Sequence, residues 1–164
     1  ADVARVPQVH AEAVPAVHGD GERLAADGLL DDLVEVADGH ADEPDLRRLC
    51  ARFAAQCDHQ EEQLQPFTAR YGSHPSGEPE RLHADGLIET RSGGLGLLRD
   101  LHDLYLLASY LDMAWMLVGQ AAKGARDQDL IRTVAECAEQ TELQQKWLTT
   151  RLKSAAPQAL LVAD

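Results

Sequence analysis

The sequence feature that most constrains the fold is a nearly continuous apolar stretch from Leu104 to Val118. Its apolar residues fall on every side of a helix, which is typical of a helix buried by several neighbours or by another subunit. The stretch is 15 residues long and contains Asp112, so it is shorter than the roughly 20 residues that a spanning helix needs. We therefore expect a long buried helix and no membrane span.

Apolar residues spaced three and four apart predict further helices, and no segment keeps the alternating pattern of a strand. We expect long helices over residues 22–37, 44–71, 95–123 and 128–154, and a short helix over 80–90. Asp42 and Asp127 stand where they can cap the second and fourth helices. Helix ends are expected at Gly39, Gly72, Gly124 and Pro157.

The same spacing predicts which side of each helix faces the core. The expected inner residues are Leu30, Leu33, Val34 and Ala37 on the first helix, Leu46, Leu49, Cys50, Phe53, Cys57, Leu64, Phe67 and Tyr71 on the second, and Leu130, Ile131, Val134, Cys137, Ala138, Thr141, Leu148 and Leu152 on the fourth. Asp31, Asp32, Glu35 and Asp38 are expected to face water.

Four such helices in 164 residues predict an all-α protein with a four-helix bundle at residues 22–157. Residues 1–21 form an N-terminal arm in this interpretation, and residues 158–164 form an apolar C-terminal tail. Short turns make antiparallel pairs of the first two and the last two helices. The long crossover between helices two and three, at about residues 72–94, is typical of a ferritin-like connection.

Charge and cysteine usage exclude several classes of protein. The chain has 15 Lys and Arg against 28 Asp and Glu, a formal net charge of −13, whereas nucleic-acid binding needs a basic face. The N-terminus lacks the basic start and apolar stretch of a secretory signal, and three cysteines (Cys50, Cys57 and Cys137) form no disulfide framework. We therefore expect a cytoplasmic protein with reduced thiols.

Polar residues interrupt the predicted inner faces at about the middle of three helices. They are Gln60 and Glu61 on the second helix, Asp112 on the third, and Thr141, Glu142 and Gln145 on the fourth. Burying a lone carboxylate is costly, so an inward acid needs a partner. Three interpretations stay open: a metal or small-ligand site, a hydrogen-bonded polar layer that fixes helix register, and a flank exposed to water.

The helix order, the connection lengths and the segment from Arg91 to Leu104 (RSGGLGLLRDLHDL) give the chain a family resemblance. Over residues 22–157 it resembles the ferritin-like four-helix-bundle family, in its small actinobacterial type. The resemblance implies a di-metal site with a Glu from each of two helices and a Glu-x-x-His from each of the other two. Iron or manganese would be its cofactor.

This sequence departs from that pattern. Glu139 and Glu142 have the Glu-x-x-His spacing with Glu in place of His, and Asp112 stands where the third helix should supply Glu. Glu61 is the acid of the second helix, whereas the literal motif Glu80-Arg-Leu-His83 lies in the crossover. The resemblance therefore implies a degraded metal site made of Glu61, Asp112, Glu139 and Glu142, with Gln60 supporting it.

Other signals for chemistry are weak. His102, between Asp100 and Asp103, is the best candidate among seven histidines for a structural or ligand-binding role. The segment Gly93–Gly96 has amides that an anion could use, but it lacks the Lys and the preceding strand of a nucleotide loop, so it indicates a helix start. Met113, Trp115 and Met116 indicate core or subunit interface rather than a cofactor site.

Two functional hypotheses follow. In the first, the chain is a non-catalytic ferritin-like bundle that acts through homo-oligomerisation, as a dimer held by apolar helix faces, or through a protein partner. In the second, it is a metal- or small-ligand-binding bundle, with di-iron-like redox chemistry, that uses its inward carboxylates.

Overall fold

The computed structural model of the chain describes residues 25–71 and 90–161, which form four helices: α1 (Ala25–Gly39), α2 (Pro44–Tyr71), α3 (Gly93–Ala125) and α4 (Gln128–Leu161). These residues contain no strand, so the prediction of an all-α four-helix bundle is confirmed for the described part of the chain. The predicted arm at residues 1–21 and nearly all of the predicted short helix at 80–90 lie outside the described residues.

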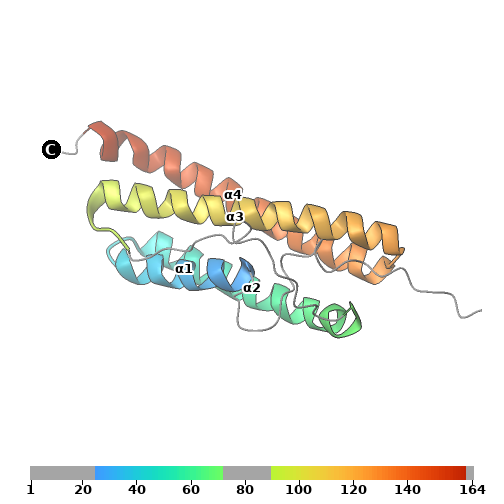
Figure 1. The fold of residues 1–164 in the computed structure, drawn as a ribbon. Helices are drawn as coiled ribbons and strands as arrows, with labels where there is room; N and C mark the ends of the chain where they lie inside the picture. Colours follow the sequence, from blue (N-terminus) through green and yellow to red (C-terminus); the bar gives the residue numbers. More distant parts are fainter. Residues whose placement is uncertain (1–24, 72–89, 162–164) are drawn as a thin grey trace, which may run out of the picture.

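The four helices form two antiparallel hairpins, α1–α2 and α3–α4, which lie side by side (Figure 1). Hydrogen bonds and ion pairs along α2 and α4, and at their first residues, join the two segments in opposite chain directions. The pairs are Glu43–Arg151, Gln56–Gln144, Gln60–Gln140 and Tyr71–Asp127. Helices α2 and α4 are therefore antiparallel, and α2 points the same way as α3.

These directions place the end of α2 and the start of α3 at opposite ends of the bundle. Tyr71 lies beside Asp127 at the start of α4, whereas Asp100 lies beside His40 in the turn between α1 and α2. Figure 1 shows the same arrangement, with both α2 and α3 starting at one end of the molecule.

Two predicted helix ends are wrong. Helix α3 continues past Gly124 to Ala125, and its C-cap is Arg126, whose φ of 55° lies in the left-handed region. Helix α4 continues through Pro157 to Leu161. A proline removes one backbone donor without forcing a helix to end, and the added turn buries Ala159 beside Gly94.

The predicted inner faces of α2 and α4 are confirmed. The structure buries Leu46, Cys50, Phe53, Cys57 and Leu64 of α2, and Leu130, Val134, Cys137, Thr141 and Leu148 of α4. The remaining predicted residues of both faces are half-buried at the edge of the same core. The hairpins also meet at an edge-to-face contact between Phe53 and Trp147, with ring centroids 5.6 Å apart.

The predicted inner face of α1 is confirmed at Leu33 and Ala37, which lie in or against the core, and is wrong at Val34. The core receives Leu29, Leu33 and Val36, whereas Val34 is exposed. Asp32, expected in water, is buried at 4% exposure. Helix α1 carries apolar residues on two overlapping stripes, and packing against α2 and α3 selects the one that ends on buried His40.

No helix in the described ranges is both long and apolar enough to cross a membrane.

Candidate functional site

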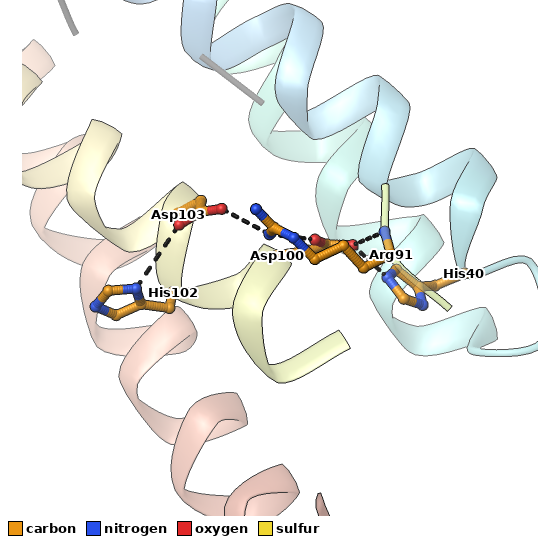
Figure 2. Close-up of polar contacts among 5 residues, drawn as sticks. All are labelled: His40, Arg91, Asp100, His102 and Asp103. Atoms are coloured by element: carbon orange, nitrogen blue, oxygen red, sulfur yellow. Dashed lines mark hydrogen bonds and ion pairs between the residues drawn. The ribbon is translucent and has the colours of Figure 1, made fainter. Parts of the chain in front are cut away.

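The most distinctive polar cluster of the structure surrounds Asp100, which is completely buried in the second turn of α3. Its Oδ2 lies 2.8 Å from Nε2 of His40, a residue in the turn between α1 and α2 that is also buried (Figure 2). The contact joins residues 60 positions apart and connects the two hairpins at one end of the bundle.

Arg91, in the segment before α3, donates the other hydrogen bonds to this carboxylate. Its backbone amide donates to Oδ2 of Asp100 at 2.9 Å, and its guanidinium donates to Oδ1 at 2.9 Å. The same guanidinium nitrogen reaches Asp103 Oδ2 at 2.8 Å. Figure 2 shows Arg91 between the two aspartates. We call His40, Arg91, Asp100 and Asp103 the Asp100 clasp.

Two glycines let the backbone come close enough for these contacts. A Cβ built on Gly39 would lie 2.4 Å from Oγ1 of Thr90, and one built on Gly96 would lie 2.6 Å from the backbone carbonyl of Arg91. The segment before α3 therefore packs tightly on both the end of α1 and the first turn of α3. Gly93, with φ of 77°, supplies a backbone conformation that other residues rarely adopt.

Sequence reasoning selected the wrong histidine. The side chain of His102 is 60% exposed, and its Nδ1 lies 3.7 Å from Asp103 Oδ1. Among the histidines that the structure describes, the buried one is His40, in the turn between α1 and α2. Its one available signal was its place directly after Gly39, at the end of a helix whose buried residues recur every three to four positions.

A second polar group lies near the middle of the bundle, where sequence reasoning expected one. Gln60 is fully buried, and its Nε2 donates to Oε1 of Gln140 at 3.0 Å and to the carbonyl of Cys137 at 3.4 Å. Thr141, also fully buried, accepts from Nε1 of Trp115 at 3.0 Å and donates to the same carbonyl. For Gln60 and Thr141 the hydrogen-bonded polar layer is confirmed.

Further amides extend this layer along the bundle. Gln144 is 2% exposed and donates to Gln56 on α2 at 3.2 Å. Gln145 donates to Oγ of Ser109 on α3 at 3.3 Å. Because each pair fixes one residue of α4 against one residue of a neighbour, the layer sets the register of α4 against both α2 and α3.

Three of the four predicted metal-ligating acids do not point into the bundle. Asp112 and Glu139 are exposed. Glu142 is 58% exposed and forms an ion pair with Lys146 at 2.7 Å, at the rim of a surface groove of about 380 Å³ between α3 and α4. Glu61 is half-buried and has an interaction of its own. The expectation that these four acids form one metal site is therefore corrected: in the structure they do not converge.

The reason lies in the helical phase of α3 and α4. The central line of the buried face of α3 is Leu104, Leu111 and Val118, and Asp112 projects away from it into water. In the described parts of the chain, no group of three or more His, Cys, Asp or Glu side chains is placed to hold a metal ion.

The opposite end of the bundle has its own polar junction. Asp127 caps α4, as predicted, because its Oδ1 accepts from the backbone amides of residues 129 and 130 at 3.1 Å. Its Oδ2 accepts from Arg70 at 2.6 Å and from the hydroxyl of Tyr71 at 2.7 Å. Burial alone would raise the pKa of Asp127, but these hydrogen bonds and the charge of Arg70 hold it below its ordinary value.

The fourth feature is an exposed apolar face on α3. Leu106, Met113, Met116 and Leu117 are 53%, 54%, 52% and 42% exposed. The spacing of seven and four residues between Leu106, Met113 and Leu117 places these three on one side of the helix. The apolar stretch from Leu104 to Val118 is therefore buried on one side of the helix and exposed on the other. We call the four exposed apolar residues the α3 apolar face.

These features differ in what they can do chemically. The Asp100 carboxylate already accepts three hydrogen bonds from protein groups, so the clasp suits holding elements together rather than activating a substrate. The buried thiols are poor nucleophiles, because burial raises the pKa of Cys50 and that of Cys137 to about 12. The α3 apolar face suits contact with another protein surface.

Comparison with family models, curated proteins and solved structures gave no match to this chain.

Proposed function

We propose that this chain is a non-catalytic, ferritin-like bundle protein that acts by self-association, with the α3 apolar face as the contact between two copies. The observation that carries the proposal is the exposure of four large apolar side chains on one helix, each by 42% or more. Exposed apolar patches on stable domains commonly mark protein–protein contacts.

The ferritin-like part of the proposal is supported by helix direction. Helices α2 and α3 point the same way, whereas the helices within each hairpin are antiparallel. An up-down-down-up order needs one long connection between the second and third helices, and ferritin-like bundles have one such connection.

A second copy is the favoured occupant because the face is self-complementary. Leu106 and Leu117 lie toward its two ends, with Met113 between them. When two α3 helices pack antiparallel about a two-fold axis, the leucine at one end of each copy meets the leucine at the other end of its partner. The symmetric dimer is also the commonest form of soluble oligomer.

Sedimentation velocity over the micromolar concentration range tests the proposal. We expect a species with twice the mass of one chain in the wild type, and a monomer in Met113→Glu. The matched control is Leu143→Glu, since Leu143 is 53% exposed but lies on α4, and this variant is expected to stay dimeric. A wild type that is monomeric at every concentration would contradict the proposal.

The described residues give the metal-binding hypothesis no group of three or more ligating side chains placed to hold an ion. Asp112, Glu139 and Glu142 are exposed, and their positions in the described structure give no observation in its favour.

A further inference from the structure

The sulfur-containing side chains of the chain divide sharply between core and surface. Both methionines, Met113 and Met116, belong to the α3 apolar face and are 54% and 52% exposed. The three cysteines, Cys50, Cys57 and Cys137, are 0%, 1% and 0% exposed. The sulfur that solvent can reach is therefore confined to the proposed contact surface.

An oxidant arriving from solvent would react with the methionines before the cysteines. Hydrogen peroxide attacks cysteine through its thiolate, and burial raises the pKa of Cys50 and that of Cys137 to about 12. A methionine thioether needs no deprotonation. Its sulfur is oxidised as the O–O bond of the peroxide breaks: one oxygen becomes bonded to sulfur as a sulfoxide, and the other leaves as water with both protons.

A sulfoxide changes the chemical character of the α3 apolar face. Met113 lies between Leu106 and Leu117, and Met116 directly precedes Leu117 in the sequence. The thioether is apolar, whereas the sulfoxide oxygen is polar and accepts hydrogen bonds. Packing that oxygen against the leucines of a second copy would bury it without a donor, which is costly. Two-fold symmetry applies this cost twice in each dimer.

We propose that Met113 and Met116 form a peroxide-sensitive modification site, whose oxidation to sulfoxides dissociates the dimer held by the α3 apolar face. The effect on assembly rests on the proposed self-association, whereas the selective oxidation of the two methionines does not. Leucine, which fills the other two positions of the face, supplies similar apolar surface. Methionine adds a sulfur that can be oxidised and reduced again. Oxidation acts on the monomer, whose face is uncovered, and withdraws it from association.

The test treats the wild type and a Met113→Leu/Met116→Leu double variant with hydrogen peroxide at low protein concentration, where monomer is present. Catalase then removes the peroxide, sedimentation velocity measures the dimer Kd, and peptide mass spectrometry locates the added oxygen atoms. We expect sulfoxides at both methionines of the wild type, unmodified cysteines, and a Kd raised roughly tenfold or more. The double variant is the matched control, since it keeps the apolar surface and its Kd should not respond to peroxide.

Reduction provides a second readout. Methionine sulfoxide reductases with dithiothreitol restore the thioether, so they should return the wild type to its original Kd. An unchanged Kd with sulfoxide at both positions would overturn this inference and leave the proposed dimer standing. Equal weakening of the double variant, or oxidation of the cysteines before the methionines, would overturn it as well. An untreated wild type that is monomeric at every concentration would instead contradict the proposed function, and the effect on assembly with it.

Discussion

Asp100 accepts a hydrogen bond from His40 at 2.8 Å across 60 residues of sequence, and through this contact the start of α3 is attached to the end of α1. The same carboxylate binds the backbone and the side chain of Arg91. A single buried acid thus joins three segments: the turn after α1, the segment before α3 and the start of α3 itself.

Replacing Asp100 with Asn should destabilise the fold. The amide keeps one oxygen acceptor but turns a donor toward groups that themselves donate, so we expect a loss of about 2–3 kcal/mol in the free energy of unfolding. Urea denaturation measures it. The control, Asp112→Asn, changes an exposed acid of the same helix and should stay within about 0.5 kcal/mol of the wild type. The reverse ranking would contradict the burial described for these two residues.

Two glycines of α3 should respond oppositely to alanine. At Gly96 the new Cβ would come within 2.6 Å of the Arg91 backbone, so the segment before α3 must move. The free energy of unfolding should fall by about 1–3 kcal/mol, which lowers the thermal midpoint by several degrees. At Gly124 the new Cβ would meet no atom within 4 Å beyond its chain neighbours and the nearby backbone of its own helix. Alanine should therefore stabilise by about 0.5–1 kcal/mol, because it favours helix. Equal effects at the two positions would rule out close packing at Gly96.

The Asp127 junction should contribute stability that depends on pH. Its pKa is lowered from 3.8, so its charged form stabilises the fold at neutral pH. This contribution is lost as the pH falls below 3.8 through the folded-state pKa. Asp127→Asn keeps a good capping residue but removes the charge, so the variant should be less stable than the wild type at pH 7. The two unfolding curves should converge in acid, and a constant gap between them would contradict the lowered pKa.

The thiols of Cys50 and Cys137 should react slowly in the native protein. A pKa of about 12 in place of 9 reduces the thiolate fraction at pH 8 roughly a thousandfold. Iodoacetamide labelling followed by peptide mass spectrometry should modify both cysteines in denaturant and neither, over the same time, in the folded chain. Rapid native labelling at either position would show that the thiol is not shielded as the structure describes.

The sequence by itself determined the helices and the inner faces of α2 and α4. On those helices apolar residues recur at three and four positions and polar residues fill the gaps, so burial and periodicity give the same answer. Gln60 and Thr141 could also be assigned to the buried faces of their helices, because each interrupts such a stripe and is followed by apolar residues in phase with it. Asp127 was predictable from local chemistry alone, since capping involves only its own helix.

Only the tertiary structure decided which faces of α1 and α3 are buried and, as a result, which of their charged residues lie in the core and which face water. Helix α3 is apolar on all sides, so its amino-acid sequence does not distinguish the face at Leu111 from the face at Met113. For the same reason Asp112 could not be assigned to the core or to water. Packing against α1 and α4 decides this by covering one face and leaving the other exposed. The pairing of His40 with Asp100 likewise depends on two hairpins meeting at one end of the bundle, a relationship that local periodicity does not contain.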